Sequence, residues 1–269
     1  MAIARDPDGN GPWFSARTGE ANLDAIARCD VVIHLAGAPI GERRWSASVK
    51  SEIYASRVYG TRALVAGLAR MDAAPPVLIS ASAIGFYGDR GAEELTEVSA
   101  QGRGFLSRVV ADWESEAAGA AGVCERVLMA RTGIVLDGAG GLLARLLPLY
   151  RLGLGGRLGG GDQYMSWIAL EDEVDALVHL AMASKLTGAV NLVSPEPLTN
   201  RDFSATLARV LRRPNFATVP QGLLGVALGK QMASELVMAS QRVLPAALLG
   251  DSYRFSYTSL GGAIQASAR

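Results

Sequence analysis

Residues 77–89 (VLISASAIGFYGD) constrain the fold of this chain most, because an apolar run there changes abruptly into small residues, hydroxyls and glycines. A short apolar run bounded by turn residues is typical of a strand buried on both faces, as in a parallel sheet. Open α/β sheets bind their ligands beyond the carboxyl ends of such strands. We therefore expect Ser80, Ser82 and Tyr87 to line a ligand crevice. An ordinary polar turn after the strand is the competing interpretation.

Strand and helix patterns alternate around this stretch. Residues 31–36 (VVIHLA) and 126–136 (RVLMARTGIVL) are predicted to be strands, the second one breaking at its threonine and glycine. Residues 45–68 and 105–113 carry apolar side chains mostly three or four positions apart, which is typical of amphipathic helices. This alternation predicts right-handed crossovers and a parallel sheet. We expect His34, inside the first strand, to be a core or strand-end histidine rather than a ligand.

The chain becomes glycine-rich from about residue 137. Residues 153–161 (GLGGRLGGG) look like a phosphate loop, but they follow a predicted helix and lack the GxGxxG spacing. A flexible loop on the substrate side is therefore favoured. Strands are also expected at 165–168 and 190–193, and acidic residues 171–173 are expected to open a helix. Residues 199–202 form a capping box before the next helix. The tail over 220–249 is expected to be helical, with Met232, Leu236 and Val243 inward, and residues 253–257 alternate like a strand.

Composition excludes several classes of function. The 26 Lys and Arg residues balance the 26 Asp and Glu residues, so there is no general electrostatic reason to bind nucleic acid or an anionic membrane. Cys29 and Cys124 form no CxxC pair and fit a reducing compartment. With only two histidines and no ligand cluster, we expect no metal site. No stretch is long and apolar enough to span a membrane, and the first residues are no signal peptide. We expect a cytoplasmic protein that acts on a small molecule.

A set of short motifs follows in order along nearly the whole chain. They are HLAGAP (34–39), RRW (43–45), SASAIGFYG (80–88), DWE (112–114), RTGIVL (131–136), GLGG (153–156) and SWI (166–168). This ordered set resembles the atypical short-chain dehydrogenase/reductases labelled "epimerase family protein", which are related to the NAD-dependent epimerases and dehydratases. The resemblance implies a Rossmann-like, doubly wound and mostly parallel sheet. It also implies two domains, a dinucleotide-binding domain over 1–213 and a small, largely helical domain over 214–269.

The resemblance further implies the positions of a cofactor and a substrate. The cofactor would be NADP(H) or NAD(H), and the choice between them stays open. Residues implied to bind it are Leu35, Ala36 and Gly37 on the adenosine or pyrophosphate side, Ser80 and Ala81 at the nicotinamide ribose, and Arg131, Thr132 and Gly133 around the nicotinamide. Residues implied to close on the substrate are Gly155, Gly156 and Trp167.

The chain departs from this family at its start. The family opens with a strand, a GxxGxxG turn and a helix that receive the dinucleotide pyrophosphate, and no such unit precedes residue 31. We therefore expect an N-terminally truncated sheet that binds the dinucleotide weakly or not at all. Loss of the central first strand would expose an edge beside Val31, Ile33 and Leu35, so we also expect self-association into homo-oligomers. A truncated reading frame is the favoured explanation, and a strand supplied by a partner is another.

The second departure concerns the catalytic groups. Typical members of the wider superfamily carry Tyr-x-x-x-Lys on the helix after the serine strand, whereas residues 105–109 here are FLSRV. Ser82 keeps the place of the substrate-orienting serine. Tyr87 is a second candidate for catalysis, although a structural role is favoured for it. These two are the predicted catalytic residues.

The resulting hypothesis is an NAD(P)-dependent oxidoreductase or epimerase-like protein with an unknown small substrate of nucleotide-sugar type. Two alternatives stay open. One is a non-catalytic NADP(H) sensor that kept the pocket and lost the proton donor. The other is a truncated interaction protein that binds no cofactor. Binding without turnover would indicate the first, and failure to bind any dinucleotide would indicate the second.

Overall fold

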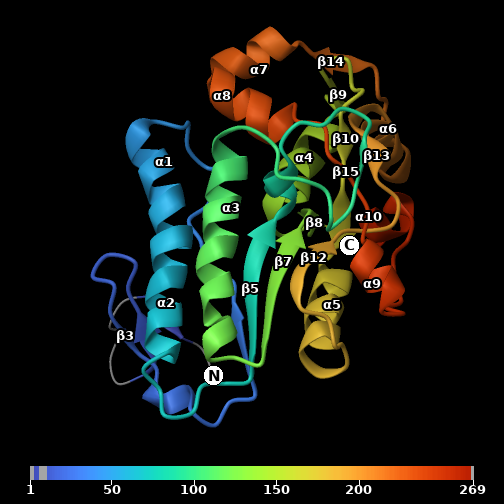
Figure 1. The fold of residues 1–269 in the computed structure, drawn as a ribbon. Coiled ribbons are helices and arrows are strands. Elements are labelled where there is room, and N and C mark those ends of the chain that lie inside the picture. Colours follow the sequence, from blue (N-terminus) through green and yellow to red (C-terminus); the bar gives the residue numbers. More distant parts are fainter. Residues whose placement is uncertain (1–2, 6–10, 268–269) are drawn as a thin grey trace.

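The computed structural model describes residues 3–5 and 11–267, and a parallel four-stranded sheet lies at its centre (Figure 1). The strands lie in the order β12-β7-β5-β4, and each neighbouring pair is parallel. Their bounds are Val31–His34 for β4, Val77–Ala83 for β5, Arg126–Thr132 for β7 and Gly188–Leu192 for β12. The predicted parallel α/β sheet is confirmed.

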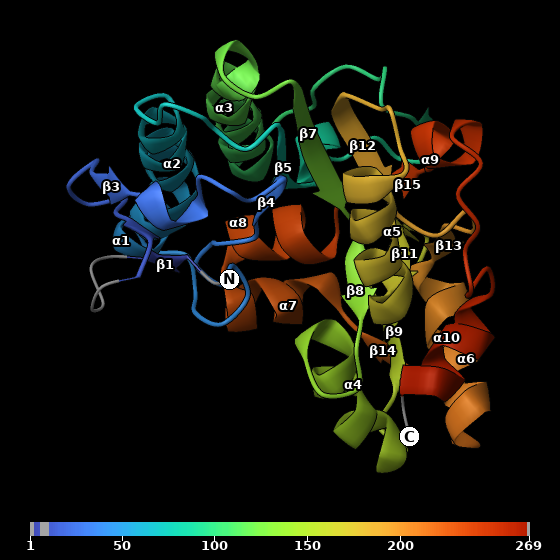
Figure 2. The ribbon, with the colours of Figure 1, turned by 90° about the horizontal axis from the view of Figure 1, so that it is seen from below.

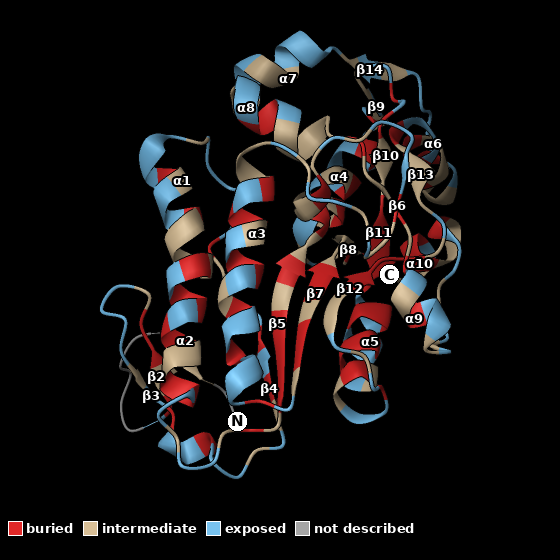
Figure 3. Ribbon diagram, viewed as in Figure 1, coloured by how far each residue is buried: buried red, intermediate tan, exposed pale blue. Residues whose placement is uncertain are grey.

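Helices cover both faces of this sheet. Figure 2 shows α2 (Gly60–Leu68) and α3 (Phe105–Ala118) on one side and α5 (Leu170–Met182) on the other. Leu78 packs into the core that contains α2, and Ile79 into the core that contains α5. Both side chains are fully buried, and Figure 3 shows burial along β5 and β7. Strand β5 is therefore buried on both faces, as its apolar run predicts.

The helix predicted over 45–68 is continuous but not uniform. It consists of α1 (Ala47–Tyr54), a π-helical turn η2 (Ala55–Tyr59) and then α2. Ile53 and Val58 lie five positions apart, yet each is only 1% exposed. An α-helix does not place residues five apart on one face, whereas a π turn does, because its hydrogen bonds span five residues. The π turn therefore lets both side chains reach the core.

The N-terminal part forms a small sheet of its own. Its strands are β1 (Ala4–Arg5), β2 (Trp13–Phe14) and β3 (Ala21–Asn22) in that order, followed by a 3-10 turn, η1 (Asp24–Ile26). Strand β1 is at one edge of this sheet, and β4 is at one edge of the central sheet. A groove of about 220 Å³ lies along β4 and is lined by Ile3, Phe14, Ile26, Cys29, Leu64 and the residues from Val31 to Ala36. Ile33 and Leu35 are 41% and 60% exposed at this edge.

The chain after β7 builds a second group of short paired strands. The pairs are β8 (Ile134–Leu136) with β11 (Trp167–Ala169), β9 (Gly156–Leu158) with β14 (Ala217–Val219), and β10 (Tyr164–Met165) with β13 (Leu198–Thr199). Three helices pack around one core beside them, α4 (Gly141–Arg151), α6 (Asn200–Leu211) and α10 (Leu260–Ser267). The Thr199 side chain accepts the Asp202 N–H, so the predicted cap of α6 is confirmed.

The C-terminal segment crosses over the central sheet. Helices α7 (Gln221–Leu228) and α8 (Lys230–Met232) lie beyond the carboxyl ends of β5 and β7 (Figure 1). A π turn, η5 (Ala233–Val237), follows them. Within it, Glu235 Oε2 accepts the Leu106 N–H at 2.9 Å. This contact joins the C-terminal segment to the first turn of α3.

Two predictions for this segment are wrong. The tail over 220–249 is not helical throughout, because Arg242–Val243 form strand β15, which pairs with β6 (Glu94–Leu95) before α9 (Ala246–Gly250) begins. Val243 is inward, as expected, but in a strand. Residues 253–257 form no strand either. Their backbone is held by α5 instead, because the Asp172 carboxylate accepts the N–H groups of residues 256 and 257 at 2.7 and 2.9 Å.

The predicted loop over 153–161 contains a strand, which corrects the expectation of a flexible loop. Gly156 lies in β9 against Ala217 of β14, where an added Cβ would be 2.1 Å from the Ala217 carbonyl oxygen. Gly155 packs on the Tyr150 ring in the same way, with an added Cβ 2.4 Å from a ring carbon. These two glycines are therefore needed for close packing.

Three further observations concern the described residues. No helix within them has both the length and the apolar character to cross a membrane. They contain no cluster of three or more His, Cys, Asp or Glu side chains that could hold a metal ion. The two cysteines, Cys29 and Cys124, are free.

Candidate functional site

The carboxyl end of β5 carries the predicted catalytic residues, but their side chains are enclosed. Ser80, Ser82 and Tyr87 are 0%, 5% and 0% exposed, so they do not line an open crevice. Tyr87 ends the short 3-10 turn η3 (Ile84–Tyr87) that follows the strand. Ser82 Oγ donates to Glu114 Oε1 of α3 at 2.5 Å. The serine hydroxyl is thus oriented by a carboxylate.

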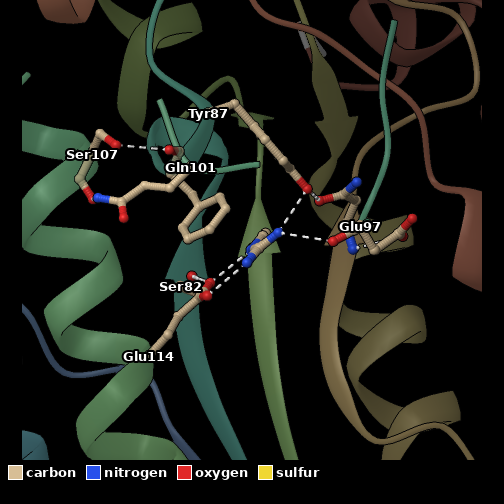
Figure 4. A network of polar contacts seen from close by, with 9 residues as sticks. Ser82, Tyr87, Glu97, Gln101, Ser107 and Glu114 are labelled. Atoms are coloured by element: carbon tan, nitrogen blue, oxygen red, sulfur yellow. Dashed lines mark hydrogen bonds and ion pairs between the residues drawn. The ribbon is translucent and has the colours of Figure 1, made fainter. Parts of the chain in front are cut away.

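A buried ion pair forms the centre of this region (Figure 4). Arg131 of β7 donates from Nε and Nη2 to the two carboxylate oxygens of Glu114, both at 2.7 Å. The side chains are only 5% and 9% exposed. The guanidinium also lies 3.6 Å from the centroid of the Phe86 ring. Such a two-point pair in a low-dielectric setting is strong only because both partners are satisfied.

Tyr87 belongs to the same network. Its hydroxyl accepts from Arg131 Nη1 at 2.9 Å and donates to Asn191 Oδ1 of β12 at 2.7 Å. The Asn191 amide in turn donates to the Leu244 carbonyl at 3.0 Å. Burial is the main cause that raises the pKa of Tyr87 above its ordinary value, so the phenol is protonated at neutral pH. Tyr87 therefore links η3 with β7 and β12, and its role in catalysis stays a prediction.

The positions that would hold Tyr and Lys in the wider superfamily carry apolar residues here, and these residues pack against other apolar side chains. Phe105, the first residue of α3, packs edge-on against Trp45 at 5.3 Å between ring centroids. Val109 is 1% exposed in a cluster with Val49 and Ile53. Neither position offers a proton donor or a cation.

The segment after β4 is the open part of this edge. Leu35 is 60% exposed, whereas His34 is buried with Nε2 3.0 Å from Thr61 Oγ1. Burial lowers the pKa of His34 to about 4, so it is a neutral core histidine, as expected. Gly37 lies flat against the Arg57 guanidinium, where an added Cβ would be 3.1 Å from Cζ. The Arg57 Nη1 also donates to the Ala38 carbonyl at 3.0 Å.

Parallel pairing brings the implied cofactor residues to one edge. His34 pairs with Ser80, Ser82 pairs with Arg131, and Thr132 pairs with Leu192. The implied cofactor residues at the ends of β4, β5 and β7 therefore follow one another along the carboxyl side of the sheet. Their roles toward a cofactor stay predictions.

The break after β7 is tightly packed. Gly133 donates its N–H to the Leu192 carbonyl, and an added Cβ would be 2.7 Å from the Ser166 carbonyl oxygen. Thr132 Oγ1 donates to Glu173 Oε1 at 2.8 Å. The other oxygen of Glu173 is buried without a partner, and burial raises the pKa of this carboxyl to about 7.

The implied substrate residues do not join this edge. Trp167 is fully buried in the core around α4, α6 and α10, and its Nε1 donates to the Glu196 carbonyl at 2.9 Å. This placement counts against contact between Trp167 and a substrate. Gly155 and Gly156 are accounted for by packing, so their role toward a substrate stays a prediction.

Sequence reasoning missed Glu114, Asn191, Glu173 and Arg57. One signal was available for the first, because Glu114 lies four residues after the buried Val110 and so shares its inward helix face. A charged residue on such a face is almost never buried without a partner. No comparable sequence signal marks Asn191, whose partners come from segments far away in the chain.

Comparisons with known proteins agree with this architecture. Residues 16–192 match the "NAD dependent epimerase/dehydratase family", and residues 219–267 match a "Domain of unknown function (DUF1731)". The boundary predicted at residue 213 lies between the two matches and stays a prediction. An epimerase family protein of Mycobacterium bovis is 39% identical over 93% of this chain and 82% of its own length.

Two solved structures extend the comparison. The human epimerase family protein SDR39U1 (isoform 2), crystallised with NADPH, superposes with a TM-score of 0.86 at 29% identity, over 99% of this chain and 89% of that one. A nucleoside-diphosphate sugar epimerase from Corynebacterium glutamicum gives 0.73 at 36% identity, over 91% of this chain and 47% of that one. By the extent of the family match and by these identities, the chain belongs to the NAD dependent epimerase/dehydratase family.

Proposed function

We propose that the protein binds NADP(H) or NAD(H) at the carboxyl edge of its central sheet and acts as an oxidoreductase or epimerase on a small, nucleotide-sugar-like molecule. The observation that carries this proposal is the alignment of residues 35–37, 80–82 and 131–133 along that edge. Ligands of open α/β sheets bind there. The NADPH named with the human relative and the sugar nucleotide named in the Corynebacterium title support the choice of cofactor and substrate.

The residues at the open end of this edge fit an anionic dinucleotide. Gly37 lets the Arg57 guanidinium lie against the backbone of the loop after β4, since an added Cβ would be 3.1 Å from Cζ. Arg57 has no carboxylate partner in the described residues, so a positive charge is available beside the loop. The exposed Leu35 offers an apolar surface of the kind that flanks a planar base.

The chain's own residues would orient the reaction. A bound nicotinamide ring supplies a hydride donor or acceptor. Ser82, whose proton is directed to Glu114, has lone pairs left to accept a hydrogen bond from a substrate hydroxyl. Both carboxylate oxygens of Glu114 accept hydrogen bonds from Arg131, so this carboxylate is already held in an ion pair. Ser82 is therefore assigned to orientation rather than to proton transfer, and Tyr87 to holding β7 and β12 in place.

We infer that the 269 residues bind the dinucleotide weakly. Before β4, the structure describes residues 3–5 and 11–30, and these form short strands and a 3-10 turn. It therefore offers no α-helix N-terminus there to a pyrophosphate.

A non-catalytic sensor is the second candidate function, and one observation favours it. The polar atoms of Ser82, Tyr87, Glu114 and Arg131 already have partners within the protein, and Phe105 and Val109 replace the usual proton-transfer pair. Such a site could retain a dinucleotide without turning over a substrate.

Titration with NADPH and NADH, followed by a turnover assay with a set of nucleotide sugars, tests the proposal. We expect saturable binding of at least one dinucleotide and turnover of at least one sugar nucleotide. Binding without turnover would select the sensor. Absence of saturable binding for both dinucleotides would reject both functions and leave the cofactor-free interaction protein.

Two variants separate the roles of the predicted catalytic residues. Ser82→Ala should lower kcat more than Tyr87→Phe at saturating cofactor. A positioned proton donor contributes ~10²–10⁴-fold to rate. A loss of that size in Tyr87→Phe alone, with unchanged cofactor affinity, would make Tyr87 the proton donor instead.

A further inference from the structure

Arg57 is a charged side chain that forms no ion pair in the described residues and has no assigned role in catalysis. It lies in the π turn η2, between the loop after β4 and helix α3. Its guanidinium stacks 5.3 Å from the centroid of the Trp113 ring. Trp113 itself is 4% exposed. Arg57 is thus held between an aromatic face and the backbone of Gly37.

The hydrogen bonds of Arg57 use only part of its donor capacity. Nη1 donates to the carbonyl oxygens of Ala38 at 3.0 Å and Ile53 at 3.4 Å. An arginine has five N–H donors, and in the described residues neither Nε nor Nη2 makes a hydrogen bond to a protein acceptor. These two nitrogens are also not among the buried polar atoms that lack a partner, so they remain accessible.

The charge of Arg57 is uncompensated within the described residues. Three other arginines of this half of the molecule have a carboxylate partner, namely Arg43 with Glu52, Arg62 with Glu116 and Arg131 with Glu114. Burial lowers the pKa of Arg57 to about 10, which still leaves the guanidinium charged at neutral pH. A half-buried cation without a counter-ion attracts an anion more strongly than one in bulk water.

We propose that Arg57 is the phosphate-binding cation of the dinucleotide site, with Nε and Nη2 as its donors. This inference rests on the proposed function, because it requires a phosphate-bearing cofactor beside the loop after β4. The planar fork of a guanidinium matches phosphate oxygens in two-point hydrogen bonds. Ala38, Gly37 and Trp113 hold the fork in one orientation before the ligand arrives, which lowers the ordering cost of binding.

The position of Arg57 also bears on the missing lysine of the superfamily pair. Val109, which takes the place of that lysine, packs in one cluster with Ile53, one helical turn before Arg57. Arg57 therefore brings a cation from the neighbouring helix to the side of α3 where the chain has lost one.

Three variants test the proposal through the affinity for NADPH, measured by titration with tryptophan fluorescence as the signal. Arg57→Gln should weaken NADPH binding by about 10- to 100-fold, the range of a hydrogen-bonded charge. It should also flatten the salt dependence of the affinity, since a screened attraction is lost. Arg57→Lys keeps the charge without the fork and should recover part of the affinity. Arg62→Gln, on the same helix and paired with Glu116, should bind NADPH as the wild type does.

A fourth variant separates charge from loop tethering. The Ala38 N–H donates to Ser56 Oγ at 3.0 Å, so Ser56→Ala loosens the same loop and leaves the cation in place. We expect less than a threefold loss of NADPH affinity for Ser56→Ala. An equal loss in Ser56→Ala and Arg57→Gln would overturn the proposal in favour of a purely structural arginine.

The failure of this inference can be distinguished from that of the proposed function. If the wild type binds NADPH and Arg57→Gln binds it equally well, Arg57 is not the phosphate ligand, and the dinucleotide function stands. If the wild type binds no dinucleotide, both proposals fall. Thermal unfolding without ligand identifies folding defects. Weaker NADPH binding by Arg57→Gln with the salt dependence of the wild type would also contradict the proposal, because the lost attraction would then not be that of a charge.

Discussion

Arg131 and Arg57 lie at the same edge of the central sheet, and their surroundings are opposite. Arg131 is 4% exposed and makes a two-point ion pair with Glu114 and a hydrogen bond to Tyr87. Arg57 contacts only carbonyl oxygens, a glycine backbone and an indole face. A charge neutralised inside the protein contributes to the fold. A charge left without a partner is available to a ligand.

The same contrast extends to the strands that carry them. Ser82 near the end of β5 and Tyr87 in the turn after it are buried, whereas Ile33 in β4 and Leu35 just after it are 41% and 60% exposed. Residues implied for catalysis thus lie in the closed region and residues implied for the cofactor's phosphates in the open one. The difference indicates that the ion pair of the closed region, Arg131 with Glu114, is chiefly structural.

The largest effect should come from breaking the closed network. Glu114→Ala leaves Arg131 buried without its counter-charge, and removal of one partner of such a pair costs about 3–5 kcal/mol of the free energy of unfolding. Urea denaturation measures it. Glu116→Ala is the matched control on the same helix, because its partner Arg62 is 60% exposed and such pairs contribute up to about 1 kcal/mol. Equal costs for the two variants would contradict the structural assignment of the closed region.

The next effect concerns Glu173, the unsatisfied group beside the closed region. Burial raises the pKa of its carboxyl to about 7 from the ordinary 4.5, against the smaller opposing effect of the Thr132 hydroxyl. The folded protein therefore holds this proton to a higher pH than the unfolded chain does. Stability from this group is complete below pH 4.5 and is lost as the pH rises through 7.

Glu173→Gln should remove that pH dependence. We expect the variant to be more stable than the wild type at pH above 7, by at most about 3 kcal/mol. Below the ordinary pKa of the carboxyl, the two should be equal. Denaturation curves across this pH range measure the difference. If the variant follows the wild-type pH profile, Glu173 does not cause the pH dependence. Water would then reach its carboxyl, contrary to the prediction.

The smallest effect is expected at the open edge. We expect the chain to self-associate through β4, because an unpaired edge strand with apolar side chains pairs readily with another chain. Ile33→Lys should weaken this association by up to about 1.5 kcal/mol. Light scattering against concentration measures it, with Val98→Lys as the control at a 94% exposed site. A monomer at all concentrations would show that the edge is protected.

Much of this contrast follows from sequence rules. The change from an apolar run to small residues at Leu78 to Ser82 predicts a buried strand with a functional end, and the parallel topology predicts that residues 35–37 and 131–133 lie beside it. The enclosure of Ser82 could not be predicted in the same way. It depends on Glu114 and Arg131, which look like ordinary solvated charges until packing places them on inward faces.

The wrong predictions share a physical cause. Alternating Tyr253, Phe255 and Tyr257 have the period of a strand, but Asp172 accepts backbone N–H groups that a strand partner would otherwise take. Trp167 is also enclosed, by the core around α4 and α6, and its role toward a substrate stays a prediction. Each outcome was decided by a partner distant in sequence, and local patterns contain no information about such partners.

The π turn η2 makes the number of residues between β4 and α2 as important as their types. It adds one position between Ile53 and Val58, and Arg57 within it donates to the Ala38 carbonyl of the loop after β4. Deleting Ala55 would restore an uninterrupted α-helix and rotate every preceding residue by about 100° relative to those that follow. The arginine and the helix face before it would then be out of phase. Single-residue insertions and deletions here should therefore be tolerated less well than substitutions at the same positions.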